Sequence, residues 1–263
     1  MNWVSELQTS GLKISFRIKK VLYRKRSEYQ LIEVFDTYEF GRMMMLDRKV
    51  MLTQRDEFIY HEMIVHPAVA LLGEIKNVLV IGGGDGGTVR ELLKYSPEKI
   101  TLVEIDRFVV EASKKFFPEM GDALSNPVVD IVFDDGAEFV KKTEDRYDLV
   151  IVDSTDPVGP GEVLFSEEFI SDIFRITDVV ASQTESPFLH REIIVQYHKR
   201  LKKFFKNIVF YTANIPTYPS GVWSFTIGVN FEPVVRLKRS FQYYTPDVFE
   251  SARIIPPAFR IDA

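Results

Sequence analysis

The stretch NVLVIGGGDGGTVRELL, residues 77–93, constrains the fold of this chain more than any other. It begins with an apolar run of strand length, continues as a glycine-rich turn, and ends with the apolar spacing of a helix. A second apolar run, ITLVEID at residues 100–106, follows closely. A strand, a helix and another strand in this order predict a parallel β-α-β unit. Such units build open sheets that carry helices on both faces.

The same alternation continues towards the C-terminus. Further strands are predicted in VVDIVFDD, DLVIVD, DVVASQ, NIVFYTAN and WSFTIGV, and helices at residues 107–117, 166–175 and 188–204. This pattern favours the α/β class, with a Rossmann-like, mostly parallel and doubly wound sheet.

The residues before position 56 follow a different pattern. Residues 12–55 alternate apolar and polar side chains in short runs between turn residues, which is typical of antiparallel hairpins with one solvated face. The next segment, EFIYHEMIVHPAVALL, predicts a helix that is broken or kinked near Pro67. We therefore predict an N-terminal β-hairpin domain over residues 1–55 and a Rossmann-like catalytic domain over residues 56–263.

The glycine turn has the spacing of a nucleotide-binding motif. Gly82, Gly84 and Gly87 fit G-x-G-x-x-G between a strand and a helix, and Glu104 ends the next strand about 20 residues later. The glycines would allow a ligand to approach the backbone closely, and the acid can accept hydrogen bonds from a ribose. The alternative is a tight strand–helix turn that needs glycine for its own geometry, with Glu104 solvated.

Asp85 lies inside this turn and narrows the choice of nucleotide. A carboxylate at this point would repel the pyrophosphate of a dinucleotide, which argues against an NAD enzyme. An adenosine ligand with a cation there would be attracted instead. S-adenosylmethionine and its relatives have this character, because they carry a sulfonium and an amine in place of phosphates.

Carboxylates also follow two other predicted strands. Asp134 and Asp135 can hold an adenine amino group or simply form a turn, and Asp153 ends the strand DLVIVD. Ligands bind outside the carboxyl ends of the strands in an open parallel sheet, so these acids should meet Asp85 and Glu104 at one edge.

The loop DSTDPVGPGE, residues 153–162, adds Asp156 to this edge. Its prolines and glycines prevent the strand from continuing. Carboxylates that are withdrawn from water need a cationic partner, and an amine substrate would supply one. A magnesium site with oxygen ligands is a weaker alternative, and no histidine lies near these motifs to complete a transition-metal site.

Composition excludes several classes of protein. The 263 residues carry a net charge of −5, which argues against nucleic acid as the main partner. The absence of cysteine excludes disulfides, thiolate catalysis and cysteine zinc sites. We see no signal peptide and no apolar run long enough to span a membrane, so we expect a cytoplasmic protein without a membrane partner.

Taken together, these motifs resemble the spermidine synthase family of polyamine aminopropyltransferases. The resemblance covers nearly the whole chain and is carried by YQLIEV, QRDEFIYHEM, GGGDGG, VEID, DSTDPVGP, QTESPF and IPTYPSGVWSF. It implies a small N-terminal β domain, a Rossmann-like domain of the S-adenosylmethionine-methyltransferase type, and a homodimer or homotetramer. The implied reaction moves an aminopropyl group from decarboxylated S-adenosylmethionine, a co-substrate, to putrescine. It releases spermidine and methylthioadenosine and needs no metal and no cofactor.

The resemblance also implies roles for individual residues. Asp153 is expected to help deprotonate the attacking amine, Asp85 to hold the aminopropyl ammonium of the donor, and Glu104 to bind its ribose. The other residues expected at the donor are Gln30, Gly82, Gly84 and Asp135, and those expected at the amine are Tyr60, His61, Asp156 and Tyr218.

Two segments depart from the family. FSEEFISDIFRITDVVASQ is shorter than usual and lacks the Asp-Gly turn before its strand. Where the family reads Leu-Asp-Gly-x-x-Gln, this chain has LDRKVM, so Arg48 replaces the glycine and Met51 replaces a glutamine that normally reaches the ligand cleft. The preferred amine stays open between putrescine, cadaverine, agmatine and a longer polyamine. Two other classes also stay open. One is a methyltransferase, whose intact S-adenosylmethionine would place a carboxylate unfavourably beside Asp85. The other is a non-catalytic protein that binds polyamines or nucleosides.

Overall fold

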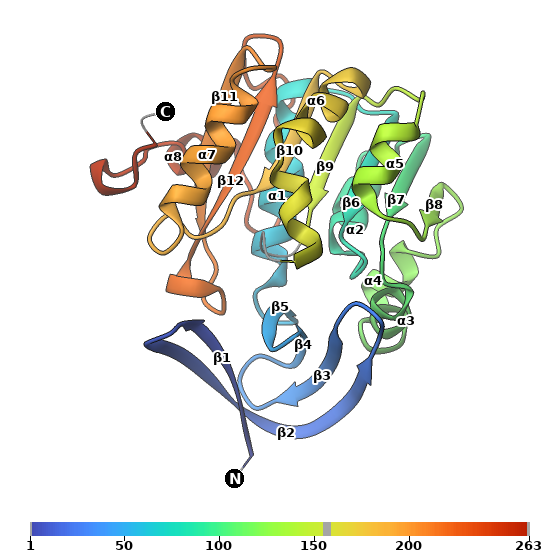
Figure 1. Ribbon diagram of the computed structural model, residues 1–263, viewed down its shortest axis with the longest axis vertical. Helices are drawn as coiled ribbons and strands as arrows, with labels where there is room; N and C mark the ends of the chain where they lie inside the picture. The colour runs from blue at the N-terminus through green and yellow to red at the C-terminus, as the bar shows by residue number, and fades with distance from the viewer. Residues whose placement is uncertain (1, 155–158, 262–263) are drawn as a thin grey trace.

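The computed structural model describes residues 2–154 and 159–261, which form two sheets (Figure 1). The N-terminal sheet pairs antiparallel in chain order and consists of β1 (Trp3–Thr9), β2 (Leu12–Arg26), β3 (Leu31–Thr37), β4 (Arg42–Leu46) and β5 (Lys49–Thr53). The predicted hairpins are therefore present.

The second sheet has seven strands in the order β11-β12-β10-β9-β6-β7-β8. Its strands are β6 (Asn77–Gly82), β7 (Lys99–Val103), β8 (Val129–Val132), β9 (Leu149–Asp153), β10 (Val179–Gln183), β11 (Asn207–Asn214) and β12 (Val222–Val229). The five strands from β10 to β8 are parallel, whereas β12 pairs antiparallel with both β10 and β11. This is the mostly parallel, Rossmann-like sheet that the sequence predicts.

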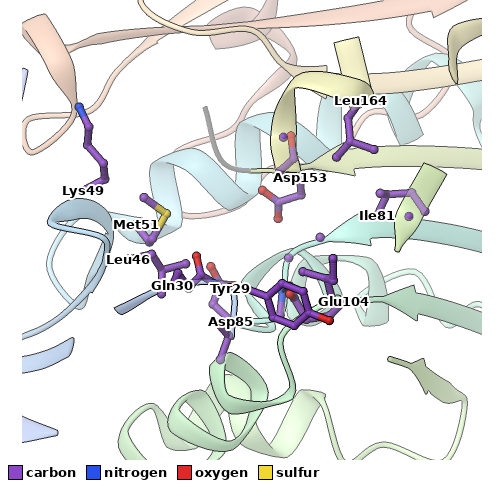
Figure 2. Close-up of a pocket in the computed structure, with 18 of the residues that line it drawn as sticks. Tyr29, Gln30, Leu46, Lys49, Met51, Ile81, Asp85, Glu104, Asp153 and Leu164 are labelled. Carbon is purple, nitrogen blue, oxygen red and sulfur yellow. Dashed lines mark hydrogen bonds between the residues drawn. The ribbon is translucent and has the colours of Figure 1, made fainter. Parts of the chain in front are cut away.

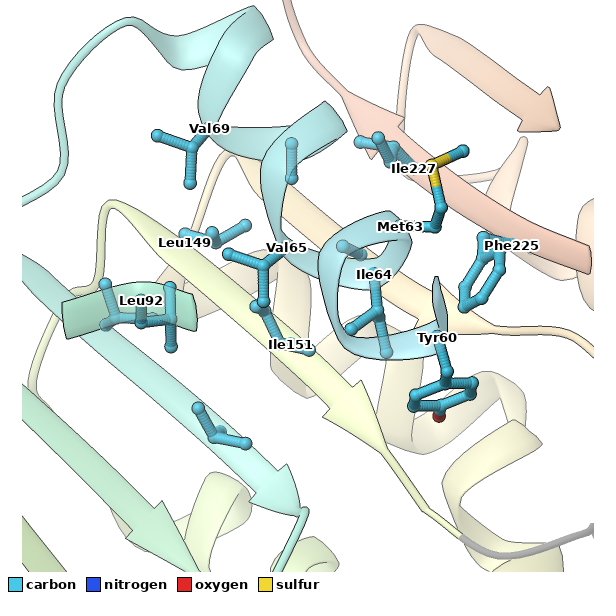
Figure 3. Packing of buried hydrophobic residues seen from close by; sticks show 14 of the residues in the cluster. Tyr60, Met63, Ile64, Val65, Val69, Leu92, Leu149, Ile151, Phe225 and Ile227 are labelled. Carbon is cyan, nitrogen blue, oxygen red and sulfur yellow. The ribbon is translucent and has the colours of Figure 1, made fainter. Parts of the chain in front are cut away.

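Helices cover both faces of this sheet (Figure 1). One face carries α1 (Glu57–Leu72), α2 (Gly87–Leu93) and α8 (Pro246–Ala252), and the other carries α5 (Gly136–Lys142), α6 (Glu167–Ile176) and α7 (Arg191–Leu201). The strand side chains alternate between the two cores: Val78 and Val80 belong to the first, and Leu79 and Ile81 to the second. Figure 3 shows the first core, where Val65 of α1 packs above Ile151 of β9. Among the described helices, none has both the length and the apolar character that crossing a membrane requires.

Helix α1 continues through Pro67, so the predicted break in it does not occur. Proline has no N–H to donate to the carbonyl four residues earlier, which belongs to Met63. The hydroxyl of Tyr211 on β11 donates to that carbonyl at 2.8 Å. A side chain from the sheet thus replaces the hydrogen bond that the helix loses.

The two sheets meet through α3 (Arg107–Phe116) and α4 (Pro118–Ala123), whose apolar side chains pack against β3, β4 and β5. A second connection lies at Asp56, between β5 and α1. Its Oδ1 accepts a hydrogen bond from Thr53 at 2.5 Å, and its Oδ2 accepts two from Thr217, at 2.8 and 3.1 Å. The division into domains at residue 55 stays a prediction. Residues associated with both sheets form the contacts that join them.

Candidate active site

The glycine turn connects β6 to α2 and brings two carboxyl-bearing residues close to its backbone. Gly82 has a φ of 78°, and a Cβ atom there would collide with the carbonyl oxygen of Asp153. At Gly84 a Cβ atom would lie 2.6 Å from Oε2 of Glu104. The N–H of Gly83 donates to the Asp153 carbonyl at 2.8 Å. These glycines therefore allow the ends of β7 and β9 to approach the turn.

A cavity of about 410 Å³ opens where the parallel strands end and reaches the N-terminal sheet (Figure 2). It gathers nine of the predicted site residues: Gln30, Tyr60, Gly82, Gly84, Asp85, Glu104, Asp135, Asp153 and Tyr218. His61 is not among the described residues that line it, and Asp156 lies outside the described residues.

Asp153 is the last residue of β9, and both of its carboxylate oxygens accept short hydrogen bonds. The hydroxyl of Tyr60 donates to Oδ1 at 2.6 Å, and that of Thr88 donates to Oδ2 at 2.6 Å. Burial, together with the negative charge of Asp85, raises the pKa of Asp153 above its ordinary value. A carboxylate with a raised pKa is a stronger proton acceptor, which suits a general base.

The pKa of Asp85 is shifted in the opposite direction to that of Asp153. Its Oδ1 accepts the N–H of Gly87 at 2.7 Å and lies 3.4 Å from Nε2 of His61. Burial raises the pKa of Asp85, but the charge and hydrogen bond of His61 outweigh this effect, so the pKa lies below its ordinary value. The cavity thus contains one carboxylate kept ionised and one prepared to take a proton.

His61 lies behind Asp85 and is the link to a buried ion pair. Its Nδ1 is 2.6 Å from Oε2 of Glu57, one helical turn earlier, and Arg90 donates to both oxygens of Glu57 at 2.7 and 2.9 Å. Burial alone would lower the pKa of His61, but Asp85 and Glu57 raise it to about 10. The structure therefore presents His61 as a cation that supports Asp85.

Glu104 follows β7 and faces the cavity next to the turn. Its two oxygens accept the N–H groups of Gly84 at 3.1 Å and Asp106 at 2.8 Å. Burial raises the pKa of Glu104 to about 7. The side-chain amide of Gln30 donates a hydrogen bond to Asp106 at 3.1 Å. This bond ties a residue between β2 and β3 of the N-terminal sheet to the loop that carries Glu104. Hydroxyl groups of a ribose would find acceptors here.

Asp135 occupies the first position before α5 and caps that helix. Its Oδ1 accepts the N–H groups of Ala137 at 2.8 Å and Glu138 at 3.2 Å. Ile81 lies against the next residue, Gly136, and Leu164 is another apolar side chain of the cavity wall (Figure 2). This part of the cavity suits a flat aromatic base.

Aromatic rings form the wall near Asp153. The ring centroids of Tyr60 and Tyr218 are 5.5 Å apart, and Trp223 packs 5.0 Å behind Tyr218. The hydroxyl of Tyr218 donates to the carbonyl of Met51 at 2.5 Å, which joins the two sheets across the cavity. Aromatic faces beside a carboxylate suit a cationic amine with a methylene stem.

Known protein families match nearly the whole chain. Residues 57–238 match the model of the spermine/spermidine synthase domain, and residues 2–54 match that of the spermidine synthase tetramerisation domain. The chain belongs to the spermine/spermidine synthase family. Polyamine aminopropyltransferases from Alkaliphilus metalliredigens and Bacillus subtilis are 45% and 42% identical to it, over 97% of this chain and 95% and 96% of those proteins.

The fold agrees with this assignment. A spermidine synthase solved in complex with the transition-state analogue AdoDATO matches with a TM-score of 0.93 at 34% identity, over 97% of this chain and 92% of that one. The protein is therefore a polyamine aminopropyltransferase with the Rossmann-like fold that the sequence predicts. The alternatives of a methyltransferase and of a non-catalytic binding protein are set aside.

Several residues of this aminopropyltransferase site had no signal in the sequence. Thr88 is fully buried and contacts Asp153, and Glu57 and Arg90 support His61 from behind. Lys49 lines the cavity while its ammonium donates to the carbonyl of Leu7 at 2.9 Å. The contacts of Thr88, Arg90 and Lys49 join distant segments, which sequence spacing does not reveal, whereas Glu57 lies one helical turn from His61.

The structure shows the surroundings of Arg48 and Met51, the two residues of LDRKVM that depart from the family motif. Arg48 adopts a φ of 68°, in the left-handed region where glycine is unstrained. Its Nε lies 3.0 Å from Oε2 of the fully buried Glu33. An ion pair thus accompanies the strained backbone. Met51 lines the cavity, as the family's glutamine would be expected to do.

One group of described side chains has the spacing of a metal site but serves the protein instead. Glu62, His66 and Glu91 are buried and place one ligand atom each within 4.8 Å of one another. Glu62 accepts the N–H groups of residues 242–244, and Oε2 of Glu91 on α2 lies 2.8 Å from Nε2 of His66 on α1. We assign these carboxylates to holding the C-terminal segment and α2 against α1.

Proposed function

We propose that this enzyme transfers the aminopropyl group of decarboxylated S-adenosylmethionine to putrescine, giving spermidine and methylthioadenosine. The observation that carries the proposal is the pair of acids in one cavity, where Asp85 lies against His61 and Asp153 is held by Tyr60 and Thr88. These surroundings lower the pKa of Asp85, through His61, and raise that of Asp153, through burial. A bound ammonium needs the first, and a proton acceptor needs the second.

The donor fits the half of the cavity next to the glycine turn. Adenine lies between Ile81 and Leu164, and the ribose hydroxyls donate to Glu104. The aminopropyl ammonium then meets Asp85, which also disfavours intact S-adenosylmethionine, because that molecule would bring a second carboxylate to the same place. Calorimetry with both compounds tests this selection, and equal affinities would contradict it.

The amine fits the half lined by Tyr60 and Tyr218. Putrescine is protonated near neutral pH, so one nitrogen must lose a proton before it can attack. Asp153 accepts this proton, and the freed lone pair then attacks the carbon next to the sulfonium. The carbon–sulfur bond breaks, its electron pair stays on sulfur, and neutral methylthioadenosine leaves. The new secondary amine carries the positive charge that the sulfonium loses.

A single assay separates the candidate acceptors. The purified enzyme receives decarboxylated S-adenosylmethionine with putrescine, cadaverine, agmatine or spermidine in separate reactions, and products are identified by mass. Putrescine should give the highest kcat/KM. A higher value for another amine would keep aminopropyl transfer and overturn the choice of putrescine.

Two aspartate variants test the assignment of roles. Asp153→Asn should lower kcat by roughly 10²-fold or more, as expected when a general base is lost. Asp156→Asn should act mainly on the KM of the amine. Asp130→Asn, at an exposed position of β8, is the matched control and should behave like the unmodified enzyme. A normal kcat for Asp153→Asn together with a lost kcat for Asp156→Asn would reverse the two roles.

The N-terminal sheet supports a further proposal, that the enzyme is a homo-oligomer. Its first two strands expose large apolar side chains, with Trp3 and Leu7 of β1 at 57% and 63% exposure. Such side chains on neighbouring strands are typical of a surface that another subunit covers. Light scattering of the unmodified enzyme and of a Trp3→Ser, Leu7→Ser variant tests this, and a monomer in both would contradict it.

A further inference from the structure

Thr88 contacts the proposed proton acceptor without lining the described cavity. It is the second residue of α2, its side chain has no exposed surface, and it is not among the described residues that line the cavity. Its Oγ1 lies 2.6 Å from Oδ2 of Asp153. Because Asp153 is ionised when it acts as a base, the hydroxyl must be the donor in this contact.

The contact matters because of the geometry of Asp153. A carboxylate on a strand end can rotate about its last bond, and each rotation presents different lone pairs to a substrate. Tyr60 fixes Oδ1 and Thr88 fixes Oδ2, so the plane of the carboxylate is defined from both sides. Each oxygen has a second lone pair for the amine proton, so the two donors orient the base without blocking it.

The same contact connects the two halves of the reaction. Thr88 follows directly after the glycine turn, which carries Asp85, and the turn itself binds the backbone of Asp153 through the N–H of Gly83. The donor-binding turn therefore holds Asp153 at its backbone and at its side chain. A displacement of the turn would also displace the proton acceptor.

We propose that Thr88 is a positioning residue for aminopropyl transfer, and that its hydroxyl orients Asp153 and favours its ionised form. This inference rests on the role proposed above for Asp153. Tyr60 faces the cavity and contributes to amine binding as well, whereas Thr88 acts through Asp153 alone.

The test compares Thr88→Val, Thr88→Ser and Asp153→Asn. Valine keeps the volume and removes the donor, and serine keeps the donor. We expect Thr88→Val to lower kcat at pH 7 by about tenfold, as the loss of a hydrogen bond to a charged group would do. The loss of the hydrogen bond also raises the pKa of the base. The acidic limb of the profile of kcat/KM for the amine should therefore move to higher pH, and activity should recover at high pH.

Three readouts separate positioning from general damage. The affinity for methylthioadenosine, which has no nitrogen at Asp153, should stay unchanged in Thr88→Val, and Thr88→Ser should restore the pH profile. Thr177→Val is the matched control, because Thr177 is equally buried and its hydroxyl exchanges hydrogen bonds with the backbone of Val179, at the start of β10. It should leave the profile in place even where it lowers thermal stability.

The outcomes are distinguishable. An unmoved pH profile in Thr88→Val, or a serine variant as impaired as the valine variant, would overturn the role of Thr88 while Asp153→Asn still loses turnover. Normal turnover in Asp153→Asn would overturn the proposed base itself, and the role of Thr88 with it.

Discussion

The Nε2 atom of His61 lies 3.4 Å from Oδ1 of Asp85, and their side chains are only 2% and 15% exposed. A buried carboxylate stays ionised only when a partner offsets the loss of water. His61 supplies that partner as a cation, and Glu57 and Arg90 behind it complete the charge balance. The anion proposed to bind the donor ammonium is thus maintained by residues that are not among the described residues lining the cavity.

Replacing His61 by glutamine should make donor binding sensitive to pH. Without the cation, burial raises the pKa of Asp85. The Asp85 carboxylate of the variant therefore takes up a proton in acidic solution and no longer attracts the donor ammonium. We expect the variant's Kd for decarboxylated S-adenosylmethionine to rise about tenfold between pH 8 and pH 5.5, and that of the unmodified enzyme by less than about threefold. Isothermal titration measures both.

Two controls accompany this experiment. Methylthioadenosine has no aminopropyl ammonium and should show no such difference. His198→Gln changes another buried histidine, which bonds Thr226 on β12 away from the cavity, and should bind the donor like the unmodified enzyme. An identical pH dependence in His61→Gln and the unmodified enzyme would contradict the role given to His61.

Glu104 should connect stability to pH in a predictable direction. Its folded pKa of about 7 exceeds the ordinary 4.5, so the folded state holds a proton that the unfolded state releases. The stabilisation is complete below pH 4.5 and is lost as pH rises through 7. The unfolding free energy of the unmodified enzyme, minus that of Glu104→Gln, should therefore fall by up to about 3 kcal/mol between pH 4.5 and pH 8. Urea denaturation at both pH values checks this, and a constant difference would refute it.

Met51→Gln should alter the choice of amine without affecting the donor. The substitution adds a donor and an acceptor to an apolar part of the cavity wall near Tyr218. A hydrogen bond to an ammonium would lower the KM of putrescine by about three- to tenfold. Steady-state kinetics with each amine provide the measurement. Met43→Gln cannot serve as the control, because Met43 is fully buried and a polar side chain there would disturb the core. A change in donor KM of the same size would show that Met51 lies at the donor instead.

Tyr211 and Pro67 should be energetically coupled. Tyr211→Phe leaves the Met63 carbonyl buried without a donor, which costs about 1–3 kcal/mol. Pro67→Ala restores an N–H four residues after Met63, so the same change should cost at least about 1 kcal/mol less in the Pro67→Ala background. Chemical denaturation of the four proteins gives the coupling, and additive losses would contradict it.

The sequence predicts the sheet and its edge well because both depend on local patterns. Apolar runs that end in Asp153 and Glu104 identify strands whose carboxyl ends meet, and the structure brings them to one cavity. A break at Pro67 was the part of this pattern that failed: the helix continues, and the hydroxyl of Tyr211 on β11, far along the chain, bonds the carbonyl that the proline cannot reach.

The support of the site could not be predicted in the same way. Nothing in the spacing of His61 distinguishes a residue that contacts a substrate from one that lies behind Asp85. Thr88 likewise has no distinguishing pattern, and its contact with Asp153 spans 65 positions in the sequence. Such relationships arise from packing between elements, which only the three-dimensional structure supplies.

The hydrogen bond from Tyr218 to the carbonyl of Met51 spans 167 positions in the sequence. One part of the cavity wall thus comes from the first quarter of the chain, and the part bonded to it comes from a segment after β11. A chain that emerges from the ribosome forms its N-terminal parts first. The nascent chain therefore has the glycine turn and Asp153 well before it has Tyr218, and the cavity stays open on that side until the segment after β11 has emerged.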